Sequence, residues 1–276
     1  MYNLDIGVII PLEKLLENGV QELTDLGLNA CQINAWNCEN LTEENAEKIK
    51  AMIEEHDIIV SSLWVGWPGP KIWDFIDGPS TLGLVPKEFR FERMEALKKG
   101  ADFAKLIGIT DITTHVGFIP ENPSTTEYME TVMIIRDVAR YCKNLGLYFN
   151  FETGQETPIT LLRTIEDIGL DNLGINLDPA NLLMYGKGNP QDAVDMYGDY
   201  IRGVHVKDGL YPTDGRNLGK ETPVGEGSVD FPVLIKKLKE HNFTGALIIE
   251  REISGPQQKE DILKAKALLE EILANL

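Results

Sequence analysis

Eight short runs of apolar, β-branched and aromatic residues recur along the chain, and each is followed by a longer segment of helical period. The runs cover residues 5–10, 30–35, 59–64, 111–115, 148–152, 173–178, 203–207 and 246–251. Such alternation predicts parallel strands joined by crossover helices. Eight units in 276 residues, with no internal linker rich in Pro, Gly or Ser, predict a closed (β/α)8 TIM barrel that forms a single domain over residues 1–276.

The segments between these runs carry helical signals. Residues 43–55 and 93–106 have apolar residues at intervals of three and four, which is the spacing of one helix face. Gly108, Gly146 and Gly169 follow the ends of predicted helices. Glycine tolerates the left-handed conformation common at a helix end, so we expect a turn into the next strand at each of them.

The composition argues against several classes of protein. A formal net charge of −18 opposes binding to a phosphate backbone, which depends on Lys and Arg, so no nucleic-acid partner is expected. The glycine-rich motifs of nucleotide-binding loops follow none of the predicted strands. Cys31, Cys38 and Cys142 lack the spacing of a disulfide framework or a thiolate zinc site. With no run of about 18 apolar residues and no basic-flanked leader, we expect a cytoplasmic protein with no membrane partner.

Four consecutive predicted strands carry polar residues at their carboxyl ends, where the active sites of such barrels lie. These residues are Glu152, Asp178, His205 and Glu250. Alone, each carboxylate is more often a helix cap or a surface ion pair, and a single histidine is more often a hydrogen-bonded core residue. Together, three carboxylates would repel one another in a partly buried pocket unless a cation joined them. We therefore predict one divalent metal ion, with Mn, Mg or Co favoured and Zn compatible.

Further candidates for contact with a substrate lie nearby in the sequence. Lys207, two residues beyond His205, is expected to face the pocket, or else to form an ion pair with Asp178 or Glu250. His115 closes the fourth strand, where the alternative is a histidine that supports another side chain by a hydrogen bond. Glu226 lies in a Gly-Glu-Gly turn and is interpreted as structural.

The longest loop follows the third strand and reads WVGWPGPKIWDFIDGPSTLGLVP. It contains Trp64, Trp67 and Trp73, and aromatic faces pack well against the C–H face of a sugar. Long loops in compact domains are often functional, so Trp64 is a candidate substrate contact. The alternative is that the loop is an apolar plug over the mouth of the barrel.

At these positions the sequence resembles the xylose-isomerase-like barrel superfamily, which comprises sugar isomerases and epimerases and includes ketose 3-epimerases and inosose-handling enzymes. The resemblance covers essentially the whole chain. The motifs that carry it, in order, are FETGQET around Glu152, NLDPAN around Asp178, HVKD at His205, VGEGSVDF from Val224 to Phe231, and GALIIERE around Glu250.

The resemblance implies a metal held by Glu152, Asp178, His205 and Glu250, with Glu152 and Glu250 also acting as the catalytic acid/base pair. It implies that a cis-enediolate forms from a sugar or sugar phosphate, and that return of the proton gives an epimer or an isomer. Glu156 matches a position that touches a substrate hydroxyl in the family, or else it caps the next helix. Asn181 stands where the family often has a histidine, so a different substrate contact is expected there. Homodimers or homotetramers are usual for such enzymes.

Alternatives to sugar isomerisation remain open at this stage. An inosose-type dehydratase would use the same metal and base, and a non-catalytic sugar-binding barrel would keep the fold without turnover. Cleavage of DNA at abasic sites, known in the superfamily, needs a pocket rich in histidine, whereas His56 and His241 are placed at helix ends. Arg216 and Lys220 follow the seventh strand and are candidates for binding a phosphate, so phosphorylated and free sugars are both considered.

Overall fold

Eight parallel strands close into a barrel in the computed structural model, which describes residues 2–276. Around the barrel the strands run in the order β1-β10-β7-β6-β5-β4-β3-β2, so neighbours in space are also neighbours in sequence. Their bounds are β1 Ile6–Pro11, β2 Ala30–Ala35, β3 Ile59–Val65, β4 Asp111–Thr114, β5 Tyr148–Glu152, β6 Leu173–Leu177, β7 Ile201–Val206 and β10 Leu247–Ile249. The predicted TIM barrel and the order of its eight strands are confirmed, with strand ends displaced by one or two residues.

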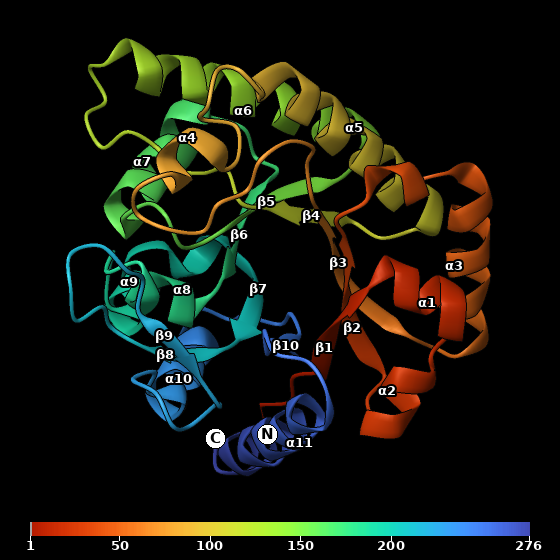
Figure 1. The fold of residues 1–276 in the computed structure, drawn as a ribbon. Helices are drawn as coiled ribbons and strands as arrows, with labels where there is room; N and C mark the ends of the chain where they lie inside the picture. Colours follow the sequence, from red (N-terminus) through yellow and green to blue (C-terminus); the bar gives the residue numbers. More distant parts are fainter. Residues whose placement is uncertain (1) are drawn as a thin grey trace.

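Helices surround the barrel (Figure 1) and shield the outward faces of the strands from water. Gly108, Gly146 and Gly169 have positive φ angles of 84°, 78° and 66° at the ends of three of them, as predicted. The helices are α1 Leu12–Asn18, α2 Gln21–Leu26, α3 Glu43–Glu55, α4 Gly78–Thr81, α5 Arg90–Ile107, α6 Thr126–Leu145, α7 Pro158–Ile168, α8 Pro179–Met184, α9 Pro190–Tyr197, α10 Phe231–Glu240 and α11 Pro256–Ala274, with short 3-10 turns at Cys38–Asn40 and Gly198–Tyr200.

Two features differ from the sequence predictions. The helix expected at residues 93–106 begins earlier, because Arg90 and Arg93 are both buried and donate hydrogen bonds to loop carbonyls, so polar residues extend the packed face of α5. The segment after β7 was predicted as a loop, but it contains an antiparallel ribbon of β8 Asp208–Leu210 and β9 Lys220–Thr222. This ribbon extends beyond the barrel strands near α8 (Figure 1).

The ribbon is fastened by a buried carboxylate that the sequence did not reveal. The Asp208 carboxylate accepts hydrogen bonds from the backbone N–H groups of Gly225 and Gly227, both at 2.9 Å, and of Val229 at 3.1 Å. The turn interpreted as structural in the sequence is therefore held against the barrel by Asp208, and Glu226 itself points to solvent.

Candidate active site and metal centre

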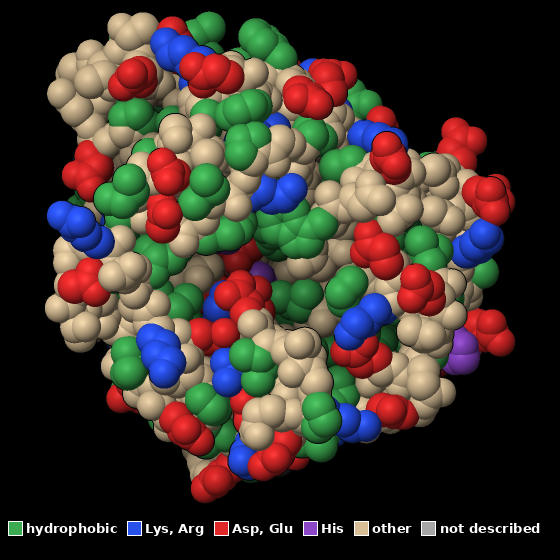
Figure 2. Space-filling view, in the orientation of Figure 1, with side chains coloured by type: hydrophobic (Ala, Val, Ile, Leu, Met, Phe, Trp, Pro, Cys, Tyr) green, Lys and Arg blue, Asp and Glu red, His purple; other side chains and the backbone are tan. Residues whose placement is uncertain are grey.

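The four polar residues predicted at the strand ends converge on one point. Glu152 is the last residue of β5, Asp178 follows β6 directly, His205 lies within β7, and Glu250 follows β10 directly. One ligand atom from each lies within 4.8 Å of the others. Figure 2 shows this point as a hollow in the centre of the molecular face, where acidic side chains and a histidine are visible.

The Nδ1 atom of His205 lies among the three carboxylates. It is 3.0 Å from Glu250 Oε2, 3.2 Å from Glu152 Oε1 and 3.8 Å from Asp178 Oδ2. Within residues 2–276, His205 Nδ1, Asp178 Oδ2 and Glu250 Oε2 are buried and have no hydrogen-bond partner. Buried polar atoms are rarely left without partners, so a shared central cation fits this arrangement.

A residue that the sequence analysis missed sets the orientation of the histidine. Gln32 in β2 lies 2.8 Å from His205 Nε2 through its Oε1 atom. Its Nε2 atom donates to Ser62 Oγ at 2.9 Å and to Asn176 Oδ1 at 3.4 Å, so Oε1 is left to accept the histidine N–H. Partners of this kind direct the other ring nitrogen of a ligating histidine toward its metal. The only sequence signal was a polar residue inside an apolar strand.

The charges of the cluster move the pKa values of its members in opposite directions. Burial raises the pKa of Glu152, but the charges of His115 and His205 outweigh burial and hold this pKa well below its usual range. Burial lowers the pKa of His205, but the charges of Glu152 and Glu250 outweigh it and hold that pKa well above its usual range. The carboxylates of the cluster therefore favour a positive charge at this point.

Asp178 has two roles at the start of α8. Its Oδ1 atom accepts the backbone N–H of Asn181 at 2.9 Å and caps the helix, while its Oδ2 atom faces the cluster. The helix-cap interpretation and the ligand interpretation of this carboxylate are thus compatible, because each uses a different oxygen. The Asn181 side chain lines the same cavity, and its Nδ2 atom lies 3.5 Å from Glu152 Oε1.

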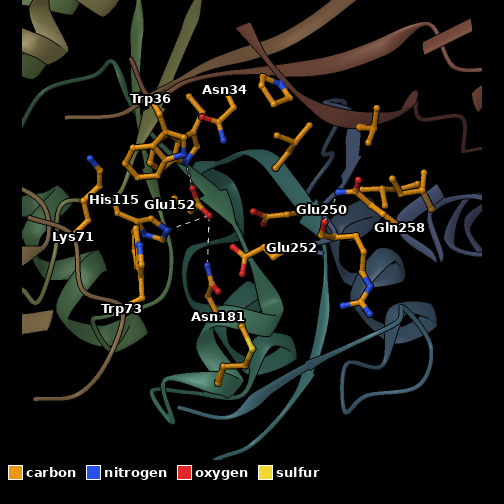
Figure 3. A pocket seen from close by; sticks show the side chains of 18 of the residues that line it. Asn34, Trp36, Lys71, Trp73, His115, Glu152, Asn181, Glu250, Glu252 and Gln258 are labelled. Carbon is orange, nitrogen blue, oxygen red and sulfur yellow. Dashed lines mark hydrogen bonds and ion pairs between the residues drawn. The ribbon is translucent and has the colours of Figure 1, made fainter. Parts of the chain in front are cut away.

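Glu152 is surrounded by donors from other strands (Figure 3). The indole Nε1–H of Trp64 donates to its Oε2 atom, and His115 Nε2 lies 3.3 Å from its Oε1 atom. Trp64 and His115 are both buried, with exposed fractions of 4% and 5%, and both line the cavity. These contacts hold the carboxylate at a fixed angle and join β3 and the residue that follows β4 to the end of β5.

Lys207 lies beside the cluster, and only 1% of it is exposed. Its Nζ atom is 2.9 Å from Glu252 Oε1, 3.4 Å from Glu250 Oε2 and 3.6 Å from Asp178 Oδ2. The structure therefore shows Lys207 in ion pairs, which was the second of the two interpretations. Its nearest partner is Glu252, which the sequence analysis did not single out. Buried against three carboxylates, Lys207 reduces the negative charge of the cluster.

Glu156 is buried, and its two carboxylate oxygens have no hydrogen-bond partner among the described residues. The helix-cap interpretation of Glu156 is wrong, because Thr157 caps α7 by accepting the N–H of Thr160. Burial raises the pKa of Glu156 to about 7, although the charge of His115 opposes this shift. Glu156 therefore differs from Glu152, four residues earlier, in that burial decides its pKa.

The cluster opens into a cavity of about 670 Å³ at the mouth of the barrel (Figure 3). Arg216 and Lys220, considered as phosphate contacts, are exposed and do not line it. His56 and His241 end α3 and α10, away from the cavity, as predicted. The residues that line it and that the sequence analysis did not single out include Asn34, Trp36, Lys71, Gln155, Tyr185 and Glu252.

The long loop after β3 is fixed to the rest of the barrel by a buried arginine. The guanidinium of Arg93 donates to the carbonyls of Gly83 at 2.7 Å, Pro70 at 2.9 Å and Pro68 at 3.2 Å. Burial lowers the pKa of Arg93 to about 10. Gly83 and Gly117, both with positive φ, touch backbone to backbone, so that a Cβ atom on either would collide with the other loop.

One protein-family model matches most of the chain. The model of the family described as "Xylose isomerase-like TIM barrel" matches residues 20–272.

Among residues 2–276, none of the helices combines the length and apolar character that crossing a bilayer requires.

Three relatives illustrate the range of similarity. The crystal structure of a xylose isomerase domain protein from Planctomyces limnophilus is 34% identical, with a TM-score of 0.93 and full coverage of both chains. A D-tagatose 3-epimerase-like protein has a TM-score of 0.75 at 21% identity, over 98% of this chain and 97% of that one, which shows the fold alone. An inosose dehydratase of Geobacillus kaustophilus is 30% identical over 46% of each chain. Since the family model spans most of the barrel, the chain belongs to the xylose isomerase-like TIM barrel family.

Proposed function

We propose that the protein is a metal-dependent isomerase or epimerase of a sugar or sugar phosphate, with Glu152 and Glu250 as the acid/base pair. The observation that carries this proposal is the convergence of four ligand atoms within 4.8 Å at the floor of a cavity lined by both glutamates. A divalent cation held by Glu152, Asp178, His205 and Glu250 would polarise a substrate carbonyl and make the neighbouring C–H more acidic. Mn, Mg and Co suit this oxygen-rich set with one imidazole, and Zn is also compatible.

The proposed chemistry is a proton transfer between carbon atoms. One glutamate removes the proton beside the carbonyl, which leaves a cis-enediolate, and the other glutamate returns a proton to the opposite face or to the neighbouring carbon. Return to the opposite face gives an epimer, and return to the neighbour gives an aldose–ketose pair. Both carboxylates line the cavity, and Trp64 fixes the angle of Glu152.

The remaining candidates would bind and orient the substrate. His115 and Asn181 line the cavity beside Glu152, where they can donate to substrate hydroxyl groups. Lys207 and Glu156 are buried, so we assign Lys207 to charge balance among Asp178, Glu250 and Glu252. Glu156 would act through His115, whose charge it senses, or contact a substrate that reaches into that corner.

A dehydratase of the inosose type is the second candidate, and the partial similarity to inosose dehydratases favours it. Such an enzyme begins with the same removal of a proton beside a carbonyl, and it then expels a hydroxyl group from the next carbon as water. The two reactions therefore share their first step at this site and differ in the product.

The test is metal analysis combined with NMR detection of deuterium uptake from D2O. The wild type, Glu250→Gln and the control Glu226→Gln would be incubated with free ketoses, ketose phosphates and inososes. We expect stoichiometric metal and deuterium uptake in the wild type and the control, and a rate lower by about 10²–10⁴-fold in Glu250→Gln. NMR signals of a product that has lost one water molecule would select the dehydratase.

Two outcomes would contradict the proposal. A wild type that binds no divalent metal would exclude the four-ligand centre. Stoichiometric metal without deuterium uptake or dehydration of any sugar would leave a non-catalytic sugar-binding barrel as the better interpretation. The exposed Glu226 serves as control because its substitution changes one negative charge without touching the cavity.

A further inference from the structure

The cavity extends well beyond the carboxylate cluster. Its volume of about 670 Å³ lies within the range of roughly 300–1,000 Å³ that holds drug-sized ligands, and it exceeds what one sugar ring fills. Glu152 and Glu250 lie near its middle, while Trp36, Lys71 and Trp73 gather on one side of them (Figure 3). A monosaccharide placed at the carboxylates would therefore fill only part of the cavity.

That side is an aromatic surface built from all four tryptophans of the chain, which we call the tryptophan wall: Trp36, Trp64, Trp67 and Trp73. The ring centroids of Trp36 and Trp64 are 4.5 Å apart, and those of Trp36 and Trp73 are 6.3 Å apart at an interplanar angle of 82°. The second and third members are buried at 4% and 1% exposure, whereas Trp73 is 38% exposed. The inner pair therefore supports Trp36 and Trp73, which are more exposed and line the cavity.

The charges around the cavity favour an uncharged ligand on this wall. Lys71 lies 5.2 Å from the centroid of the Trp36 ring and donates to Trp67 O at 3.3 Å, and it forms no ion pair within residues 2–276. The other cations of the lining are neutralised, since Lys14 pairs with Glu22 at 3.0 Å and Arg251 with Glu221 at 2.9 Å. A phosphate would meet a single unpaired cation, whereas a sugar ring would meet aromatic faces and one N–H donor.

We propose that the tryptophan wall is a subsite for a second sugar ring, so that the substrate is an uncharged two-ring carbohydrate whose ketone-bearing ring lies at the carboxylates. This inference builds on the proposed function, which supplies the reacting ring. The second ring would stack its C–H face on Trp73, which stands at 82° to Trp36, so that its edge meets the Trp36 ring while Lys71 donates to one of its hydroxyl groups. Stacking of this kind contributes affinity without requiring a charge.

The experiment compares matched one-ring and two-ring ketones. Fructose would be paired with lactulose and isomaltulose, and a ketone of methyl glucoside with the same ketone of cellobiose. For each pair, kcat/KM for deuterium exchange would be measured, and binding to Glu250→Gln, with and without Trp73→Ala, would be measured by calorimetry. We expect the two-ring member of at least one pair to be preferred by about tenfold.

The variants test whether this preference comes from the wall. Trp73→Ala is expected to weaken the two-ring ligand roughly fivefold to tenfold with little change for the one-ring ligand, and Trp73→Tyr to restore part of the preference. Ile76→Ala is the matched control, because Ile76 is 66% exposed in the same loop and does not line the cavity. Thermal melting curves verify that each variant folds.

The outcomes separate this inference from the proposed function. The subsite is overturned, even if deuterium exchange occurs, when the wild type has the same kcat/KM for one-ring and two-ring ketones. It is also overturned when the two-ring preference persists in Trp73→Ala. Tighter binding of the two-ring ligand that depends on Trp73, without exchange into any ketone, supports the subsite and contradicts the proposed function.

Discussion

The two sides of the cavity are built in different ways. The carboxylate side consists of residues at the ends of β5, β6, β7 and β10, so their positions follow from the hydrogen-bonded barrel itself. In the tryptophan wall, Trp67 and Trp73 belong to the loop after β3, which is held by Arg93 and by the contact of Gly83 with Gly117, while Trp64 lies in β3 and Trp36 follows β2. Groups that react need fixed geometry, whereas a loop can vary to suit different substrates. The comparison predicts that the proposed reaction and recognition can be changed separately, with Trp64, which donates to Glu152, as the residue that joins the two sides.

The largest effect is expected from changing the carboxylate side. Glu152→Gln removes one member of the proposed acid/base pair and one ligand, so deuterium exchange should fall by about 10²–10⁴-fold. Metal analysis should show a lower affinity for the divalent ion. The variant should still bind two-ring ligands more tightly than one-ring ligands. Exchange at the rate of the wild type would show that Glu152 transfers no proton and would break the separation proposed here.

The converse change loosens the tryptophan wall. Arg93→Met leaves the carbonyls of Pro68, Pro70 and Gly83 without their donor, and buried unsatisfied groups are costly, so we expect a loss of roughly 3–5 kcal/mol in the free energy of unfolding. Urea unfolding measures this loss, with the exposed Arg140→Met as control. Metal affinity should remain unchanged. A metal affinity that falls together with stability would mean that the two sides are coupled.

The same contrast explains what the sequence could predict. The barrel and the convergence of Glu152, Asp178, His205 and Glu250 followed from local patterns, because strand order in this fold fixes where strand ends meet. The part played by Gln32 did not follow, because its bond to His205 joins β2 to β7 across the interior and leaves no periodic signal. Trp36 was missed for a similar reason, since its contact with the loop after β3 depends on packing.

Glu152 at the end of β5 and Glu156 in the loop that follows offer a pH-dependent comparison. Burial raises the pKa of Glu156 from 4.5 to about 7, whereas the histidines hold the pKa of Glu152 well below its usual range. Between pH 4.5 and about 7 the unfolded chain releases the Glu156 proton and the folded chain retains it, so the contribution of Glu156 to the free energy of unfolding falls as pH rises. Integration over this window gives roughly 3 kcal/mol, and the loss is complete above about pH 7.

The variant that tests this is Glu156→Gln, which keeps the shape of the protonated side chain and removes its titration. Its free energy of unfolding, relative to the wild type, should rise by roughly 3 kcal/mol between pH 4.5 and 8, as measured by urea unfolding at a series of pH values. Glu166→Gln, at an exposed position of α7, is the control and should show no such trend. If the difference in free energy of unfolding between Glu156→Gln and the wild type does not change with pH, then burial does not raise the pKa of Glu156.

The smallest effect is expected where β2 supports the carboxylate side. Gln32→Leu removes the acceptor for His205 Nε2, so the ring can rotate or change tautomer, and loss of such a partner typically lowers metal affinity by about 10–100-fold. Competition with a fluorescent chelator measures this change, and Gln21→Leu on the surface of α2 is the control. Binding of a two-ring ligand at the tryptophan wall should persist. An unchanged metal affinity would show that the carboxylates orient His205 without Gln32, and that the carboxylate side is complete within β5, β6, β7 and β10.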